Sequence, residues 1–190
     1  MKKKGLIITV AVIAVVVLIA GALIGSYNNL VEDREEVVAS QSEISNQLQR
    51  RADLIPNFVA TVQGYSDYEQ ETFTAVTNAR AAVAGADTVT EQAQASQQLD
   101  SALDIWVNAV TEAYPELKAN TQYIALQDEL AGTENRIAQA RRDYNEDARE
   151  YNTEIKMFPR SILAGLFGFE AFDYFEAQQG AESVPQVSFD

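Results

Sequence analysis

The sequence predicts an all-α membrane protein, in which an N-terminal transmembrane helix is followed by an antiparallel helix bundle of three or four helices. Three observations support this fold class. An uninterrupted apolar run extends from Gly5 to Gly25, and apolar residues then recur every seven positions over long stretches of the chain. Only two prolines, Pro56 and Pro115, occur between residues 26 and 156, and no long alternation of apolar and polar residues indicates a strand.

Residues 5–25 are predicted to be a transmembrane signal anchor, because Thr9 is their only polar side chain. A helix of this length spans roughly 31 Å, about the thickness of the hydrocarbon core of a bilayer. The side chains predicted to face lipid include Leu6, Ile13, Val17 and Leu23. A cleaved signal peptide is the alternative, with Ala20-Gly21-Ala22 as its cleavage site, but its apolar run is usually only ~7–15 residues long.

The charges on either side of the anchor predict its orientation. Lys2, Lys3 and Lys4 precede the anchor, whereas residues 26–36 carry four acids and one arginine. Lys and Arg favour the cytoplasmic side of a membrane. We therefore expect residues 1–4 in the cytoplasm and a single-pass protein of the inner cell membrane, with its C-terminal domain periplasmic. The lysines could also be no more than a solubilising flank.

The domain that follows the anchor comprises residues 26–176. Its first helix is expected to continue straight out of the anchor. Its seven-residue track is Leu30, Val37, Ile44, Arg51, Phe58 and Tyr65, and a second track contains Leu48, Ile55, Val62 and Val76. Pro56 removes a hydrogen bond from the helix and clashes with the carbonyl of Ala52, which predicts a kink or a reversal there. A reversal near residues 52–56 gives four segments of similar length, and a kink gives three unequal helices. Gly85 is predicted to end this element.

Two more long helices follow. Thr88 and Glu91 have the spacing of a capping box and open the first of them. Its predicted buried face is Leu99, Leu103, Trp106, Val110 and Ala113, and it stops before Pro115. Asn120 or Thr121 can cap the next helix, whose seven-residue track is Tyr123, Leu130, Ile137, Tyr144, Tyr151 and Phe158, and Pro159 is expected to end it.

The segment 158–175 is rich in aromatic residues and differs in kind from the helices. It can cap its own bundle, contact a neighbouring subunit or lie in a membrane interface. Our prediction is a contact between subunits, made by Leu166, Phe167, Phe169, Phe172 and Phe175. Residues 177–190 are predicted to be a flexible acidic tail.

Composition excludes several classes of function. The chain has no cysteine and no histidine, so disulfides, thiol nucleophiles and His-containing di-iron sites are excluded. Its net charge of −14 argues against binding to nucleic acid. Glu129 and Glu134 are general acids in principle only, because a regularly packed bundle offers no cleft for a pair of carboxylates. We therefore expect no catalytic residue, no metal, no cofactor and no enzymatic activity.

Some polar residues fall on or beside the apolar tracks. Arg51 needs an ionic partner there, and Glu129 or Glu134 is the expected one; the alternative is an anionic ligand held in the bundle. The pairs Tyr144-Asn145 and Tyr151-Asn152 are expected to bury their rings, bond their hydroxyls and let the amides bond across helices. A sugar- or peptide-binding face is the less favoured interpretation.

The order of several short stretches resembles the LemA proteins of bacteria. The matching stretches are Tyr27-Asn28-Asn29-Leu30-Val31, residues 47–57, Gly64-Tyr65, Ala79-Arg80, residues 113–119, residues 126–130, Thr133-Glu134, Ala140-Arg141, the two Tyr-Asn pairs and Phe167-Gly168-Phe169. The resemblance covers about residues 5–176. It implies a single-span membrane protein with a four-helix bundle and specifies no activity. Phe58 stands where Leu is common in the family.

The function expected from these features is a non-enzymatic membrane scaffold whose chains self-associate into a homo-oligomer at the cell envelope. The bilayer is then one partner and a second copy of the chain another. The alternative is an adaptor for another membrane protein, such as a protease, a kinase or an envelope-stress component. In that case Gly21 and Gly25 would allow the anchor to approach a partner's span closely.

Overall fold

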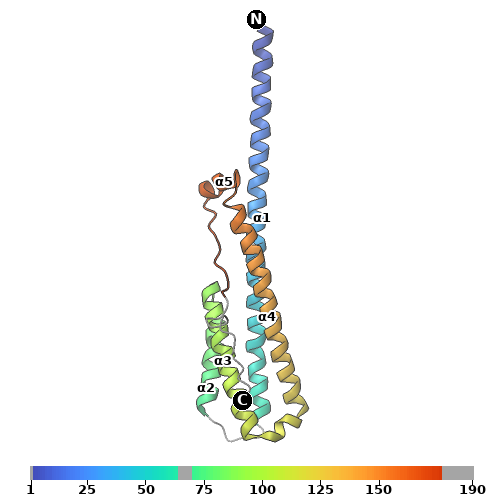
Figure 1. Ribbon diagram of the computed structural model, residues 1–190, viewed down its shortest axis with the longest axis vertical. Helices are drawn as coiled ribbons and strands as arrows, with labels where there is room; N and C mark the ends of the chain where they lie inside the picture. The colour runs from blue at the N-terminus through green and yellow to red at the C-terminus, as the bar shows by residue number, and fades with distance from the viewer. Residues whose placement is uncertain (1, 64–69, 177–190) are drawn as a thin grey trace, which may run out of the picture. The chain divides into compact units, whose positions relative to one another are not determined.

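The computed structural model describes residues 2–63 and 70–176, without the side chains of residues 2–5, 63 and 70–72. All regular structure in these ranges is helical (Figure 1). The elements are α1 (Lys2–Gln63), α2 (Gln70–Ala84), α3 (Val89–Ala113), the 3-10 helix η1 (Pro115–Ala119), α4 (Thr121–Glu154) and α5 (Arg160–Phe167). Tyr65 and the predicted tail at 177–190 lie outside the described residues. The prediction of an all-α fold is confirmed.

The chain forms two compact units. Unit 1 comprises Met1–Ser40 and Asp143–Phe172, and unit 2 comprises Gln41–Arg142 and Asp173–Asp190. The long helices α1 and α4 each contribute one part to each unit.

In unit 2, polar contacts fix the directions of α1 and α2. Arg80 of α2 donates to the carbonyl of Ala52 in α1, and Gln41 of α1 donates to the carbonyl of Asp87, just after α2. Because residue numbers rise along α2 as they fall along α1, the two helices are antiparallel.

The remaining helices of unit 2 complete the bundle. Gln92 of α3 donates to the hydroxyl of Ser45 at 2.8 Å, and further along both helices Arg51 pairs with Asp100, so α3 runs parallel to α1. Arg50 pairs with Glu129 of α4, near the start of that helix, whereas Phe58 contacts Tyr123, so α4 is antiparallel to α1. Unit 2 is therefore an up-down-up-down four-helix bundle.

Pro56 neither breaks nor reverses α1, so of the two predicted alternatives the reversal near residues 52–56 was wrong. The helix continues through it to Gln63, and the four helices have unequal lengths. Pro56 has no N–H to offer to the carbonyl of Ala52. Arg80 supplies the missing donor from α2, with its Nε 3.1 Å from that oxygen. A side chain 28 positions along the chain thus satisfies the acceptor that the proline leaves open.

The helix ends are formed by local capping. Thr88 and Glu91 form a complete capping box at the start of α3, as predicted. Asn120 caps α4, because its Oδ1 accepts hydrogen bonds from the backbone N–H groups of Gln122 and Tyr123. α5 ends at Gly168, whose φ of 72° is a left-handed conformation suited to glycine.

Three aromatic rings, the inner trio, pack at the centre of unit 2. The ring centroid of Phe58 lies 5.2 Å from that of Trp106 and 5.0 Å from that of Tyr123. The hydroxyl of Tyr123 hydrogen-bonds that of Thr111 at 2.8 Å. All three rings are almost completely buried, so Phe58 fills space between two other helices.

Most residues of the predicted core are buried: Leu30, Val37, Ile44, Leu48, Trp106, Leu130, Ile137, Tyr144 and Tyr151. Two predictions were wrong. Phe158 is 82% exposed, because α4 ends at Glu154 and turns follow, so the seven-residue phase is lost before Phe158. Ala113 is exposed at the last position of α3.

Candidate functional site

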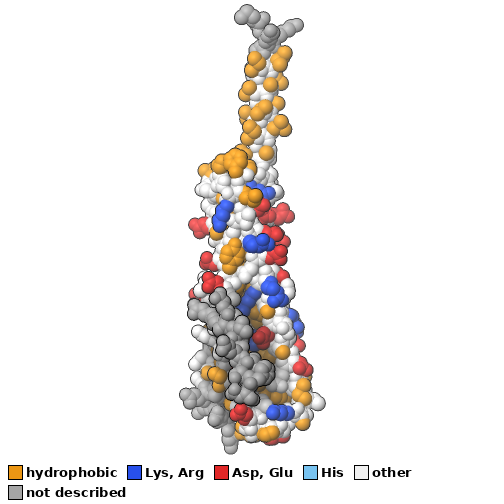
Figure 2. All heavy atoms as spheres, in the orientation of Figure 1, with side chains coloured by type: hydrophobic (Ala, Val, Ile, Leu, Met, Phe, Trp, Pro, Cys, Tyr) orange, Lys and Arg blue, Asp and Glu red, His pale blue; other side chains and the backbone are white. Residues whose placement is uncertain are grey.

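The first part of α1, residues 6–25, is exposed along its whole length. It is long and apolar enough to cross a membrane, and within the described part of the chain it is the one helix of that kind. Its large apolar side chains are all exposed, from Leu6 to Ile24. The four predicted lipid-facing residues, Leu6, Ile13, Val17 and Leu23, are among them. Figure 2 shows these hydrophobic side chains along the projecting helix. The side chains of Lys2, Lys3 and Lys4 lie outside the described residues.

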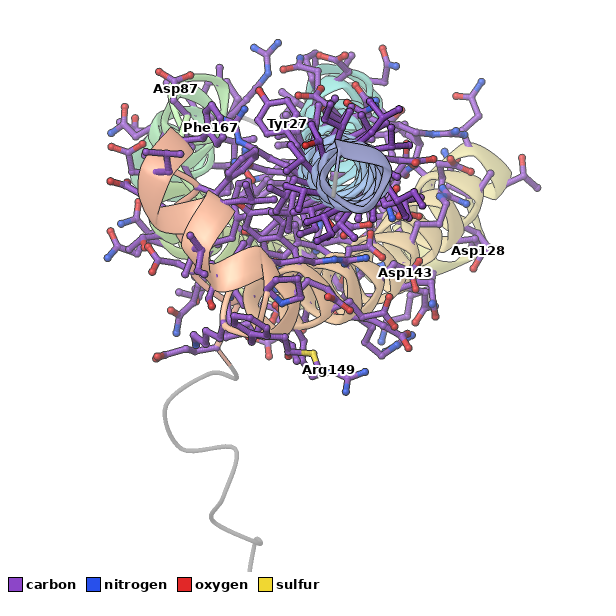
Figure 3. All side chains as sticks on the ribbon, turned by 90° about the horizontal axis from the view of Figure 1, so that it is seen from above. Tyr27, Asp87, Asp128, Asp143, Arg149 and Phe167 are labelled. Carbon is purple, nitrogen blue, oxygen red and sulfur yellow. The ribbon has the colours of Figure 1, made fainter. Side chains whose placement is uncertain are left out.

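A second group of aromatic rings, the outer trio, lies where the anchor ends. The ring centroid of Tyr27 is 4.9 Å from that of Phe167 and 5.7 Å from that of Phe169, both in edge-on arrangements. Figure 3 shows Tyr27 and Phe167 in the view along α1. Gly168 makes this possible, because its left-handed turn lets the N–H of Phe169 return to the carbonyl of Ala164 at 3.0 Å. The outer trio therefore attaches the end of α5 to α1.

Exposed apolar side chains surround this attachment. Leu163 and Ala164 are the buried residues of α5. The large apolar residues on its outside and in the turn before it are Met157, Phe158, Ile162, Leu166 and Phe167, each more than half exposed. We call these five residues the α5 patch. Of the predicted subunit contacts, Leu166 and Phe167 belong to it.

Asn152 holds the chain that follows α5. Its Nδ2 donates to the carbonyl of Phe172 at 2.8 Å, and its Oδ1 accepts from the N–H of Phe172 at 2.9 Å. The ring of Phe172 lies edge-on against that of Tyr151, with centroids 5.2 Å apart. The backbone and ring of Phe172 are therefore both used within unit 1, and its role as a subunit contact stays a prediction.

The two Tyr-Asn pairs behave differently from the prediction in two respects. Asn152 bonds an extended segment and not another helix. Tyr151 buries its ring, but its hydroxyl has no hydrogen-bond partner among the described residues, and burial raises the pKa of that phenol.

An ion cluster lies at the start of α5. Arg160 pairs with Glu154 at 2.6 Å and with Asp33 at 3.6 Å. Burial raises the pKa of Asp33, and the positive charge of Arg160 opposes this shift. A recess of about 510 Å³ beside the cluster is lined by these three residues with Arg149, Glu150 and Thr153. Its charges are largely paired or solvated.

Unit 2 contains a buried arginine. Arg51 is 5% exposed and pairs through Nη1 with Asp100 of α3, while Glu134 lies 3.8 Å from its Nη2. Asp100 was not among the predicted partners. Burial raises the pKa of Asp100, and the nearby positive charge of Arg51 opposes this shift. The position of Asp100 directly after the buried Leu99 was the available signal, since it places a carboxylate beside the core face of α3.

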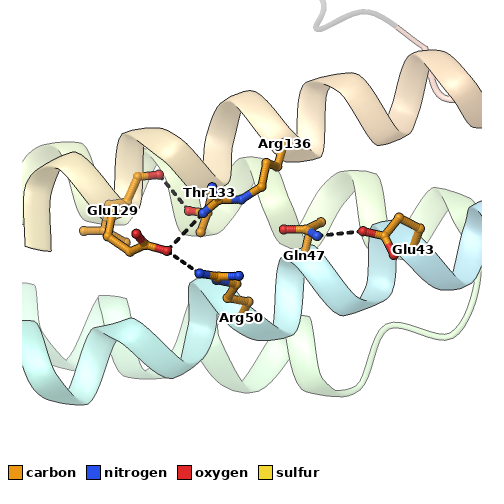
Figure 4. Close-up of polar contacts among 7 residues, drawn as sticks. Glu43, Gln47, Arg50, Glu129, Thr133 and Arg136 are labelled. Atoms are coloured by element: carbon orange, nitrogen blue, oxygen red, sulfur yellow. Dashed lines mark hydrogen bonds and ion pairs between the residues drawn. The ribbon is translucent and has the colours of Figure 1, made fainter.

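The predicted partner Glu129 belongs to the neighbouring Arg50. Its Oε1 accepts from Arg50 at 2.8 Å and from Arg136 at 3.0 Å (Figure 4). The prediction that Arg51 pairs with α4 was therefore right for Glu134 and wrong for Glu129. Both carboxylates take part in ion pairs between helices, which is a structural role.

Unit 2 has a recess on its surface, and the ring of Phe175 is covered by other residues of the same unit. A recess of about 500 Å³ between α2 and α3 is lined only by alanine and uncharged polar side chains, including Asn78, Gln94 and Gln98. Among the described residues, no three acidic side chains gather in a way that would hold a metal ion.

Phe175 is 7% exposed, and the guanidinium of Arg141 lies over its ring at 5.5 Å. Most of the Phe175 ring is therefore already covered within one copy of the chain, and its role as a subunit contact stays a prediction.

Comparison with known proteins gives consistent matches. The chain is 27% identical over 157 residues to Protein LemA of Metamycoplasma hominis, which covers 82% of this chain and 71% of that protein. It is 26% identical to magnetosome protein MamQ 2 of Paramagnetospirillum magneticum, over 95% of this chain and 76% of that one. Magnetosome protein MamQ of Magnetospirillum gryphiswaldense is 24% identical to this chain, over 96% of this chain and 77% of that protein.

The family model that matches is that of the LemA family, over residues 40–189. This range contains Glu154 and Arg160 of the ion cluster, the segment held by Asn152, and all of unit 2 except Asp190. The stretch Tyr27–Val31 that also resembles the family precedes the matched range, but the alignments with the relatives cover nearly the whole chain. The chain belongs to the LemA family.

Proposed function

We propose that the protein is a non-enzymatic membrane scaffold that self-associates into a homo-oligomer at the cell envelope, with residues 1–4 in the cytoplasm and the helical domain outside. The main observation in support of the proposal is the exposure of the apolar side chains of the anchor. Its large apolar side chains are all exposed, and a methyl group added at Gly21 or Gly25 would meet no atom within 4 Å. In a membrane this surface is free to pack against a second helix, and small residues allow close approach.

The domain supports a scaffold more than an enzyme. Its buried charges form ion pairs that join helices, as Arg51 does with Asp100. The two recesses are open and are lined by paired charges or by amides. Relatives named as a LemA protein and as magnetosome proteins suggest that the same architecture serves different settings, which fits a protein that organises others.

The mass of the purified full-length chain in lipid nanodiscs or mild detergent tests self-association. We expect a discrete oligomer. Gly25→Leu should lower the association constant of the oligomer about tenfold, which corresponds to roughly 1.4 kcal/mol. Val17→Leu is the matched control, because it adds bulk in the same helix and should leave the mass unchanged.

A monomer under all of these conditions would contradict self-association. The chain would then be an adaptor that pairs its anchor with a different membrane protein. Crosslinking from an anchor position in the native membrane would identify that partner. The predicted subunit contact through Leu166 and Phe167 stays a prediction, since both side chains are exposed.

A further inference from the structure

The outer trio fixes the depth at which α5 lies. Tyr27 is two residues beyond Gly25, where the apolar run ends, so it lies about 3 Å past that end along the helix axis. The rings of Phe167 and Phe169 pack on Tyr27. The C-terminal end of α5 is therefore held at the level where the anchor leaves the hydrocarbon core.

The direction of α5 fits a membrane surface. Figure 3 looks along α1, which is seen end-on, and in the same view α5 is seen from its side. In Figure 1 α5 lies across the end of α4 that is nearest the anchor. Since α1, α5 and this end of α4 belong to unit 1, α5 lies parallel to the plane of a membrane that the anchor crosses.

The helix has two distinct faces. Leu163 and Ala164 are buried against the rest of unit 1, whereas Ile162 and Leu166 are 61% and 72% exposed. Met157 and Phe158 extend the exposed apolar surface into the preceding turn. Figure 2 shows hydrophobic side chains gathered at the base of the projecting helix. Such a surface is unfavourable in water and favourable at the boundary between headgroups and acyl chains.

We propose that the α5 patch inserts into the interfacial layer of the same bilayer that the anchor crosses. The patch is continuous with the anchor through the outer trio, and this continuity favours lipid over a second copy of the chain. An eight-residue helix is short for independent binding. The anchor removes this difficulty, because it keeps the patch permanently beside the bilayer.

The charges near α5 indicate which lipids matter. Asp33, Glu154 and Glu170 are acidic and outnumber the basic Lys156 and Arg160, and Arg160 is already paired with Asp33 and Glu154. Attraction to anionic headgroups therefore contributes little, and insertion should occur equally in zwitterionic phosphatidylcholine. With α5 inserted, unit 1 has a second contact with the membrane, which restricts its rotation about the anchor.

The absence of cysteine allows a direct test with single-cysteine variants of the full-length chain. Leu166→Cys carries an environment-sensitive NBD label, and the protein is reconstituted in phosphatidylcholine vesicles with or without brominated acyl chains. Leu23→Cys, in the anchor, is the positive control. Ile105→Cys is the matched negative control, because Ile105 is also an exposed apolar residue but lies on α3. We expect brominated lipid to quench the label at Leu166 several times more strongly than the label at Ile105.

Two results would overturn the proposal. Aqueous iodide could quench the label at Leu166 as strongly as at Ile105, with no effect of brominated lipid. Alternatively, pyrene at Leu166 could form excimers that disappear on dilution with unlabelled chain while brominated lipid fails to quench the NBD label at Leu166, which would identify a second copy as the occupant. Ile162→Cys repeats the measurement at an independent position, and circular dichroism checks that each variant is helical. The result does not depend on self-association, since lipid quenching and oligomer mass are separate measurements.

Discussion

The two aromatic trios use the same interaction in different surroundings. In the inner trio, Phe58 contacts rings from α3 and α4, and every ring is sealed from solvent. In the outer trio, Tyr27 is half-buried and Phe167 is 57% exposed. The edge-on and tilted ring pairs of the two trios, with centroids 4.9 to 5.7 Å apart, add only ~0.5–1.5 kcal/mol each beyond the area that they bury. The buried area therefore decides the contribution of each trio.

This difference separates stability from attachment. The inner trio is covered by its own chain and holds three helices of unit 2 together. The outer trio attaches one short helix and leaves apolar surface uncovered, so it is complete only when something else covers it. The following predictions test this contrast, beginning with the largest expected effect.

Phe58→Ala should destabilise the protein by roughly 3–5 kcal/mol, because it leaves a cavity between two rings that cannot close around it. Urea unfolding followed by the fluorescence of Trp106 measures this directly, since Trp106 is the single tryptophan of the chain and contacts Phe58. Ile105→Ala is the control beside it and should cost less than about 0.5 kcal/mol. A loss below about 1 kcal/mol for Phe58→Ala would show that the inner trio is not a stabilising centre.

Arg51→Ala should cost roughly 3 kcal/mol at neutral pH, because it leaves the carboxylate of Asp100 without its main partner. The double variant Arg51→Met with Asp100→Leu should recover most of this loss, since the pair is replaced by apolar groups of similar size. Denaturation of the three proteins under the same conditions gives the comparison. Failure of the double variant to recover stability would mean that the ion pair itself is required for the fold.

The same variant has a defined pH dependence. Burial already raises the folded-state pKa of Asp100 above its ordinary value of 3.8, and Arg51 lowers it again. Without Arg51 the pKa rises further, so the folded variant binds a proton more readily than the unfolded chain does. Its stability relative to the parent should therefore improve as the pH falls through the raised pKa toward 3.8. A stability difference that is constant over this range would contradict the role of Asp100.

The seven-residue tracks predicted most of the core because bundle packing repeats at that period. They placed Leu30, Val37 and Tyr144 correctly in helices of different length. They failed at Phe158 because periodicity holds only while the helix lasts, and the helix ends four residues earlier. Periodic apolar residues thus predict which face is buried but not where the helix stops.

The polar contacts were harder to predict, because each joins residues that are far apart in the sequence. Pro56 indicated a break, yet the carbonyl that it leaves open is satisfied by Arg80 from another helix. Asn152 was expected to bond a helix, and its partner is an extended segment with no periodicity. In both cases one end of the hydrogen bond was visible in the sequence and the other depended on the tertiary arrangement.

Asn152→Ala should release the segment that carries Phe172, at a local cost of about 2 kcal/mol for two backbone hydrogen bonds. Hydrogen exchange at the N–H of Phe172 should become roughly 30-fold faster, which is the same free energy expressed as a rate. Asn135→Ala, an exposed change on the same helix, is the control. A global loss of protection in place of a local one would show that this segment is part of the bundle core.

Tyr27→Ala should have the smallest effect, about 1 kcal/mol, because the outer trio is already partly open and only two ring contacts are lost. The loss should appear as faster amide exchange in α5, with the urea midpoint of unit 2 unchanged. Tyr27→Phe keeps the ring and should preserve protection, which separates the ring contact from the hydroxyl. A fall in the stability of unit 2 as large as that caused by Phe58→Ala would remove the distinction between the two trios. Faster amide exchange confined to α5 would instead show that the outer trio is a local attachment. This is expected because its rings are only partly buried.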